Sequence, residues 1–385
     1  MILIKNGKIV TMAGETIEGG SILVDEGKIV AIGKDLSEIN TEVIDAKGQY
    51  VLPGFIDAHC HLGMWESSIG FEGADGNEMT DPVTPHLRGI DAINPMDENF
   101  EEARSLGGVT MVATGPGSAN VVGGQFAAIK TFGHVVDDMI VKAPLAMKIA
   151  FGENPKRVYS ERKVSPSTRM GTAAELRGIL FKAKEYQGQL LLGAKDPSKQ
   201  PKFDFKLEAM LPVLNKEIPL KAHAHRADDI ITAIRIAKEF DVKMTLEHCT
   251  EGHLIADYIK KEGFEAIVGP SFGAKTKFEL QNKTFDTPSI LTKAGVKIAI
   301  MTDSPVIPLH HLNMCAALSV KAGLSEEDAL KAITINAAEI LELDERVGSL
   351  SVGKDADIVI WDLHPFDLQA TPVMTMIDGK VVFKK

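Results

Sequence analysis

Apolar and polar residues follow two different patterns along the chain, one at both ends and another in the middle. Near the start, apolar residues alternate within short runs at residues 2–5, 8–12, 20–24 and 28–32, with a further run at 43–44. Asn6-Gly7 and Glu26-Gly27 separate these runs and are typical of tight hairpin turns. The other end repeats the pattern at 358–361, 372–377 and 380–383. We therefore expect the two ends, residues 1–52 and 346–385, to form one small β-sandwich domain.

The middle of the chain, residues 53–345, alternates between apolar runs and segments with helical spacing, which predicts an α/β domain. Helices are expected at 98–106, 172–186, 227–240, 252–262, 325–333 and 336–341. Ser325, followed by three acidic residues, is a favourable helix start because a hydroxyl can cap the free N–H groups. The stretch 63–95, rich in Gly, Asp, Asn and Pro, predicts a long loop.

Histidines and an aspartate stand at the ends of four predicted strands. The first apolar run ends in His59 and His61, and the period of two along a strand puts both imidazoles on one face, where they can hold the same metal ion. Three later runs end in His223, His248 and Asp303. Parallel strands that alternate with helices and close into a barrel bring their carboxyl ends to one rim. We therefore expect these five side chains to meet there, with the 63–95 loop lying over them.

Composition excludes several classes of protein. A formal net charge of −11 over 385 residues, without a basic cluster, argues against a nucleic-acid surface. No apolar run approaches the roughly 18 residues that a membrane helix needs. The start of the chain lacks the features of a secretory signal, and three cysteines make no disulfide framework, so a cytoplasmic protein is expected. Strand alternation turns Cys60 and Cys249 away from the site, which predicts that both are small core residues.

The order and spacing of several segments resemble the amidohydrolase superfamily over nearly the whole chain, closest to the branch with imidazolonepropionase and metal-dependent dipeptidases. The matching segments are NGKI (6–9), GKIVAIG (27–33), VLPGFIDAHCHL (51–62), TDS (302–304), TINAA (334–338) and GSLSVGKDADIV (348–359). The resemblance implies a distorted (β/α)₈ barrel with a β-sandwich built from both termini. It also implies one or two divalent ions, expected to be Zn²⁺, and hydrolysis of an amide or related C–N bond.

The resemblance also assigns roles to residues. His59 and His61 match the first-strand metal ligands, His223 the fifth, His248 the sixth and Asp303 the eighth. At the fourth strand, members with two ions use a carboxylated lysine or a glutamate as a bridge. The segment 146–155 offers both Lys148 and Glu153, and we slightly favour Glu153, which falls at the predicted strand end.

Other residues near the predicted rim are candidates for catalysis or substrate binding. A bound Zn²⁺ can activate water and polarise a carbonyl, and Asp303 is the natural general base that returns the proton to the leaving nitrogen. His225 faces the same side as His223 and is a second catalytic candidate, with a role in the metal surroundings as the alternative. Asn120 and Gln125, in the glycine-rich segment 114–125, and the basic pair Lys156 and Arg157 are candidate substrate contacts.

Three alternatives remain open. Deaminases of this superfamily usually place a proton-shuttling glutamate three residues after the fifth-strand histidine, where this chain has Arg226. Imidazolonepropionase-like opening of a cyclic amide fits the same residues. A non-catalytic scaffold predicts missing ligands, whereas the five main ones are present. We expect a hydrolase that acts on a small-molecule substrate, without a nucleic-acid or membrane partner, and that self-associates.

Overall fold

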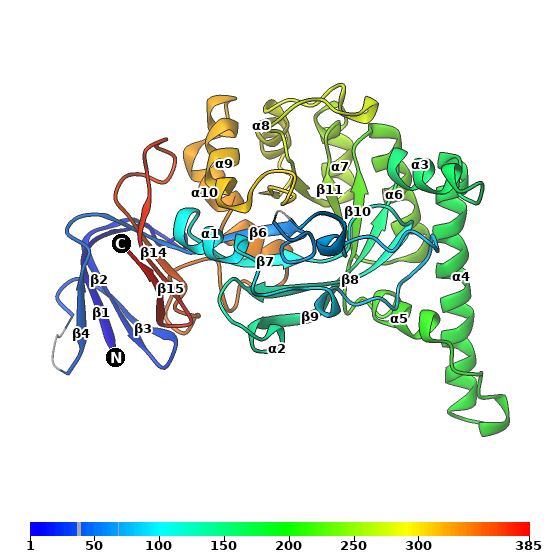
Figure 1. Ribbon diagram of the computed structural model, residues 1–385, viewed down its shortest axis with the longest axis horizontal. Helices are drawn as coiled ribbons and strands as arrows, with labels where there is room; N and C mark the ends of the chain where they lie inside the picture. Colours follow the sequence, from blue (N-terminus) through cyan, green and yellow to red (C-terminus); the bar gives the residue numbers. More distant parts are fainter. Residues whose placement is uncertain (37–39, 68) are drawn as a thin grey trace.

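Eight strands from the middle of the chain form a nearly closed barrel, shown in Figure 1 with helices packed outside it. In the computed structural model, which describes residues 1–36, 40–67 and 69–385, the strands follow one another around the barrel in sequence order. They are β6 (Phe55–Cys60), β7 (Val109–Thr114), β8 (Val122–Lys130), β9 (Ile140–Ala150), β10 (Leu220–Ala224), β11 (Met244–His248), β12 (Glu265–Val268) and β13 (Ile298–Ile300). The expected distorted barrel is confirmed.

The distortion lies at the third strand. β8 runs antiparallel to both β7 and β9, whereas the other paired strands of the barrel are parallel. Only residues 115–121 separate β7 from β8, and a parallel crossover needs about a dozen residues or more, so the chain turns straight back. The segment 114–125, expected to be a rim loop, is therefore a loop only up to residue 121, and Gln125 lies within β8.

Helices cover the outside of the barrel. They are α1 (Asn99–Leu106), α2 (Val136–Met139), α3 (Glu153–Glu161), α4 (Arg169–Gly193), α5 (Phe205–Leu214), α6 (Ala227–Phe240), α7 (Ala256–Glu262), α8 (Asp286–Lys293), α9 (Leu312–Lys321), α10 (Glu326–Ala332) and α11 (Ile335–Ile340). The six expected helices are confirmed, and Ser325 caps α10 by accepting a hydrogen bond from Asp328 N at 3.0 Å. The helix expected at 172–186 is longer, and α4 extends beyond the rest of the fold in Figure 1.

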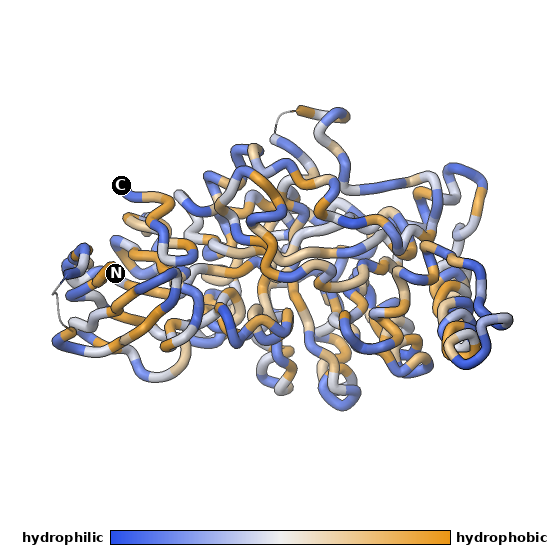
Figure 2. The backbone as a smooth tube through the Cα atoms, turned by 90° about the horizontal axis from the view of Figure 1, so that it is seen from below, coloured by the Kyte–Doolittle hydropathy of each residue, from blue (hydrophilic) through white to orange (hydrophobic). Residues whose placement is uncertain are grey.

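Strands from both termini share one eight-stranded sheet beside the barrel. They are β1 (Ile2–Ile9), β2 (Ile17–Asp25), β3 (Lys28–Gly33), β4 (Glu42–Asp45), β5 (Tyr50–Pro53), β14 (Ile358–Trp361), β15 (Pro372–Ile377) and β16 (Lys380–Lys384). β14 pairs with β5, which joins the end of the chain to its beginning. In Figure 2 the hydrophobic segments run through this sheet and the middle of the barrel, and the outer turns are hydrophilic.

One expected hairpin is wrong. Asn6-Gly7 is not a turn but lies inside β1, where the register with β2 shifts between Ile4 and Gly7. Asn6 adopts a left-handed φ of 58°, so this dipeptide makes an irregularity within a continuing strand. The Glu26-Gly27 turn between β2 and β3 is confirmed. Within the described part of the chain, no helix combines the length and the apolar composition needed to cross a bilayer.

A buried carboxylate closes the barrel between its first and last strands. Asp57 Oδ2 accepts hydrogen bonds from Thr302 N at 2.9 Å and from Thr302 Oγ1 at 2.6 Å, while Asp57 Oδ1 accepts one from His59 N at 3.0 Å. His61 N also donates to Ser304 O at 2.8 Å. The side chain of Asp57 therefore links β6 to the segment that follows β13.

We expect Asp57→Ala to lower the free energy of unfolding by about 3 kcal/mol or more. The substitution leaves buried donors on Thr302 and His59 without an acceptor, and each such loss costs about 1–3 kcal/mol. Urea denaturation followed by circular dichroism would measure the change. Thr302→Val removes the hydroxyl that donates to Asp57 and accepts from Ser304 N at 3.1 Å, so it should cost about 1–2 kcal/mol. Equal costs for the two variants would contradict the role of Asp57.

Candidate metal centre

The five predicted ligands lie together at one end of the barrel. His59 is in β6 and His61 follows it, His223 is in β10, His248 ends β11, and Asp303 follows β13. The four histidines are almost fully buried, with exposed fractions of 7% or less. The carboxyl ends of the parallel strands thus bring these distant residues together.

His59, His61 and Asp303 form a first group. Asp303 Oδ1 lies 3.2 Å from His61 Nε2 and 3.7 Å from His59 Nε2. Lys148, in β9, is fully buried, and its Nζ lies 2.9 Å from His59 Nε2. This group combines two imidazoles with one carboxylate, a donor set that suits Zn²⁺.

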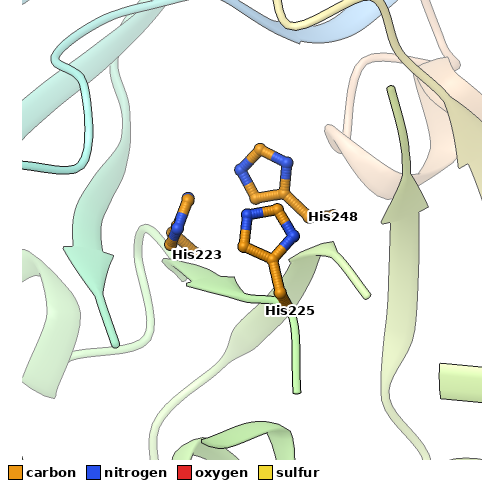
Figure 3. A group of neighbouring side chains, drawn as sticks. All are labelled: His223, His225 and His248. Atoms are coloured by element: carbon orange, nitrogen blue, oxygen red, sulfur yellow. The ribbon is translucent and has the colours of Figure 1, made fainter. Parts of the chain in front are cut away.

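His223, His225 and His248 form a second group, shown in Figure 3 with their rings around a common space. One ligand atom from each lies within 4.8 Å of those of the other two. The ring centroids of His223 and His248 are 4.3 Å apart, and those of His225 and His248 are 4.5 Å apart. The two groups adjoin, since the rings of His59 and His248 are 5.5 Å apart.

Hydrogen bonds made by the Nδ1 atoms fix the tautomer of three histidines. His61 Nδ1 donates to Gly115 O at 2.7 Å, and His248 Nδ1 donates to Gly269 O at 2.8 Å. A carbonyl oxygen only accepts, so in the neutral ring the Nε2 atom carries a lone pair. His59 Nδ1 likewise lies 2.6 Å from the Glu247 carboxylate. Partners of this kind orient metal-binding histidines.

Two buried ring nitrogens of the second group would suit a cation. His248 Nε2 and His223 Nδ1 are buried and have no hydrogen-bond partner among the described residues. A buried nitrogen lone pair without a partner is costly, whereas a divalent ion would satisfy it. The donor set therefore fits the divalent ions that the sequence leads us to expect.

Burial dominates the electrostatics of the site. It lowers the pKa of His59, His223, His225 and His248 well below the ordinary histidine range, so these rings are neutral, the form that binds metals. Burial by itself would raise the pKa of Asp303, but the adjoining histidines outweigh it and the net shift is downward. Asp303 is therefore a carboxylate at neutral pH.

Lys148 also has a shifted pKa. Burial lowers it to about 8, although the carboxylates of Asp303 and Glu247 oppose the shift. A lysine with such a pKa is neutral for part of the time near physiological pH.

Two of the site residues have unusual backbones. His248 has a φ of 67° and Asp303 a φ of 55°, in the left-handed region that residues other than glycine seldom adopt. Such conformations cost free energy and cluster at functional sites, where the surrounding structure holds them in place. Both residues turn their side chains into the site just where a barrel strand ends.

Glu153, the favoured fourth-strand residue, does not lie in either group. It is the first residue of α3, and its Oε2 accepts a hydrogen bond from Glu279 N at 3.3 Å. Lys148, the other candidate, is the one that reaches His59. The geometry therefore favours Lys148 at the fourth strand.

The four candidate substrate contacts lie in different surroundings and do not form one cluster. Asn120 is buried with both amide groups occupied, donating to Thr84 Oγ1 at 2.8 Å and accepting from Tyr159 OH at 2.6 Å. Gln125 lines an outer pocket with residues of α5. Lys156 and Arg157 are in α3, half-buried and exposed respectively.

Sequence patterns gave no signal for several residues around the histidines. Glu247 holds His59 and is paired with Lys221, whose Nζ lies 3.1 Å from Glu247 Oε2. Glu279, in the loop after β12, lies beside the second group. A carboxylate next to a strand-end histidine could have suggested Glu247, but nothing in the sequence distinguishes Glu279 from other loop acids.

The long segment expected over the rim is confirmed as mostly irregular over residues 63–67 and 69–95. Trp65 from this segment contacts His61, with ring centroids 5.0 Å apart and an interplanar angle of 70°. The buried positions of Cys60 and Cys249 are also confirmed.

Comparison with known families gives a match over most of the chain. Residues 50–382 match the model described as the amidohydrolase family. A crystal structure of an amidohydrolase from Thermotoga maritima superposes with a TM-score of 0.98 at 45% identity, covering 100% of both chains.

Curated relatives carry several different names. Amidohydrolase tasK from Hapsidospora irregularis is 30% identical over 94% of this chain, and adenine deaminase 4 from Rhizobium meliloti is 24% identical over 100% of it. The chain spans only 40% and 58% of those two proteins. An imidazolonepropionase from Fusobacterium nucleatum is 25% identical, with 96% of this chain and 93% of that protein covered.

Proposed function

The chain belongs to the amidohydrolase family, and from this we propose that it is a metal-dependent hydrolase that cleaves an amide, cyclic amide or peptide-like C–N bond of a small molecule. The observation that carries the proposal is the meeting of His59, His61, His223, His248 and Asp303 at one end of the barrel. A scaffold protein has no need for buried, neutral imidazoles without partners.

The chain's own residues supply positioning and proton transfer. Divalent ions held by these side chains would supply Lewis acidity, which activates water and polarises the scissile carbonyl. Asp303 is a carboxylate at neutral pH and is 14% exposed, so it can take a proton from the attacking water. The same carboxyl group can then protonate the leaving nitrogen, which departs only as the neutral amine.

We propose that Lys148, in the fourth barrel strand, is the residue of that strand that takes part in metal binding. Its side chain is fully buried, and its Nζ lies 2.9 Å from His59 Nε2. As a carboxylated lysine it would add an anionic oxygen donor.

Deamination of a nucleobase is the second candidate, because relatives named adenine deaminase match this chain over its whole length. Arg226 stands where those enzymes' superfamily usually has a glutamate. Its guanidinium stays protonated and pairs with Asp228 at 2.9 and 3.0 Å, so it cannot replace a carboxylate in proton transfer. This difference favours amide hydrolysis.

We expect the Zn²⁺-loaded protein to hydrolyse at least one member of a library of cyclic amides, N-acyl amino acids and dipeptides, and to lose that activity on chelation. Mass spectrometry would detect the addition of water, and an ammonia assay on a purine set would detect deamination. Re-addition of Zn²⁺ should restore the activity. Ammonia release from purines alone would reject amide hydrolysis in favour of the second candidate.

A further inference from the structure

The far half of α4 and the chain that returns from it form an arm, residues 181–205, with exposed apolar side chains. In Figure 1 this part of α4 projects beyond the rest of the molecule. Leu191 is 65% exposed and Phe203 is 74% exposed, and Phe181 and Leu192 are also more than half exposed. Exposed apolar side chains on a projecting element are typical of a surface that binds another protein.

The arm is basic, although the chain as a whole has a formal net charge of −11. Residues 181–205 contain five lysines and three acidic residues. Lys199 pairs with Asp196 at 3.5 Å. The other four lysines are exposed and form no ion pair within the described part of the chain: Lys182, Lys184, Lys195 and Lys202. The arm therefore presents positive charge that its own chain does not neutralise.

A second surface, the acidic segment at residues 69–91, has the opposite charge. It contains five acidic residues and one arginine. Four of these acids are exposed and pair with no lysine or arginine among the described residues: Glu72, Asp75, Glu78 and Asp91. The acidic segment also carries exposed apolar side chains, since Phe71 is 95% exposed and Ile69 and Met79 are partly exposed. It thus complements the arm in both charge and apolar character.

The two surfaces adjoin at the root of the arm. Lys206, just after the arm, pairs with Asp81 of the acidic segment, and the ring centroids of Phe205 and His86 are 5.4 Å apart. When two complementary surfaces lie side by side, a two-fold axis near their junction places each of them on the opposite surface of a second copy. Because this contact forms twice, both arms contribute to the roughly 1,200–2,000 Å² that specific interfaces bury.

We propose that this chain forms a two-fold dimer in which the arm of each copy lies on the acidic segment of the other. The lysines of the arm face the carboxylates of that segment, and the apolar side chains of both surfaces cover one another. A second copy is the partner because the same chain carries the complementary surface. The dimer does not depend on the proposed function, since neither surface contains a residue of the metal centre.

Charge reversal tests the proposal on the full chain. We expect the wild type to sediment as a dimer, with a dissociation constant that rises about 10-fold at an ionic strength of about 1 M, where the Debye length is about 3 Å. The arm variant combines Lys195→Glu with Lys202→Glu, and the segment variant combines Glu72→Lys with Asp75→Lys. Each should raise the dissociation constant about 100-fold, because like charges then face each other. Sedimentation equilibrium would measure these constants.

An equimolar mixture of the two variants is the decisive sample. In a mixed dimer the reversed arm faces the reversed segment, and the unchanged arm faces the unchanged segment. Both contacts therefore regain opposite charges. We expect the mixture to form a dimer with a dissociation constant within about 10-fold of the wild-type value, although neither variant dimerises alone at that concentration.

A matched control combines Lys380→Glu with Lys384→Glu. Both lysines are exposed in β16 and form no ion pair among the residues that the structure describes. This control changes the net charge as much as the arm variant does, but it should dimerise like the wild type. Circular dichroism would show that each variant is folded. If a reversed variant is not, its neutral version, Lys195→Gln with Lys202→Gln or Glu72→Gln with Asp75→Asn, should weaken the dimer about 10-fold.

Several results would overturn the proposal. They are a wild type that is monomeric at every concentration, an unchanged dissociation constant in either reversed variant, equal weakening in the control, and a mixture of folded variants that stays monomeric. A concentration-dependent series of species larger than a dimer would also overturn it, because such a series shows a contact that does not close about a two-fold axis. If the chain dimerises as expected but hydrolyses no library compound, the proposed function fails and the dimer stands.

Discussion

Asp303→Asn is expected to lower kcat/KM by about 1,000-fold for any substrate of the wild-type enzyme, which corresponds to about 4 kcal/mol of transition-state stabilisation. Asparagine keeps the shape of the side chain but has neither the negative charge nor the capacity to accept a proton. General acid–base groups contribute about 10²–10⁴-fold, and here the same residue also faces His59 and His61. Steady-state kinetics with the metal-loaded variant would measure the loss.

Asp362→Asn serves as the control for this prediction. Asp362, in the connection between β14 and β15, accepts hydrogen bonds from Thr371 at 2.7 and 2.9 Å and does not belong to the site. Its replacement should leave kcat/KM within about twofold. If Asp303→Asn retained more than a tenth of the wild-type kcat/KM with its metal content intact, Asp303 would not be the proton-transfer group.

Lys130→Met is expected to lower the free energy of unfolding by about 3–5 kcal/mol. Lys130, at the end of β8, is buried where the barrel meets the terminal sheet. Its Nζ lies 3.1 Å from Asp355, 2.6 Å from Asp357 and 3.0 Å from Asp378. Breaking a buried ion pair by removing one partner leaves uncompensated charge, which costs about that much. Methionine fills a similar volume, so the loss reports charge and not a cavity.

The matched control is Lys142→Met, in β9. Lys142 is 30% exposed and lies 3.8 Å from Glu342, so its loss should change stability by about 0.5 kcal/mol or less. Urea denaturation of both variants at pH 7 provides the comparison. Equal stabilities would mean that Lys28 and Arg346, which also contact Asp355, neutralise the cluster without Lys130.

The convergence of the candidate metal ligands could be predicted from sequence because it depends only on the fold class and on where the strands end. His59, His223 and His248 each lie in or at the end of a strand that runs in the same direction. Their convergence follows from the barrel, whatever the lengths of the helices between them. The boundaries of α6, at residues 227–240, were predictable for a similar reason, since its apolar spacing is regular.

The antiparallel β8 could not be predicted in the same way. Its start, with Gly123 and Gly124, looks like a glycine-rich loop, and strand pairing depends on partners far away in sequence. Asn6-Gly7 was misread because the dipeptide suits both a hairpin turn and an irregular strand position. Local sequence cannot distinguish these outcomes.

The choice between Lys148 and Glu153 also required the structure. Both residues are close in sequence, but Lys148 lies within β9 and points into the barrel, whereas Glu153 begins α3. Where β9 ends decides which of them reaches the histidines. Glu279 was missed for a related reason, because a loop residue takes its position from contacts that only the folded chain makes.

The closure by Asp57 affects when the enzyme can become active during its synthesis. Asp57 and its partner Thr302 stand at opposite ends of the barrel sequence, next to His59 and Asp303. A ribosome-bound chain from which the segment after β13 has not yet emerged contains His59 and His61. It lacks both Thr302, which closes the barrel, and Asp303. Truncated chains that end before residue 302 would therefore lack both the barrel closure and the Asp303 carboxylate of the first group.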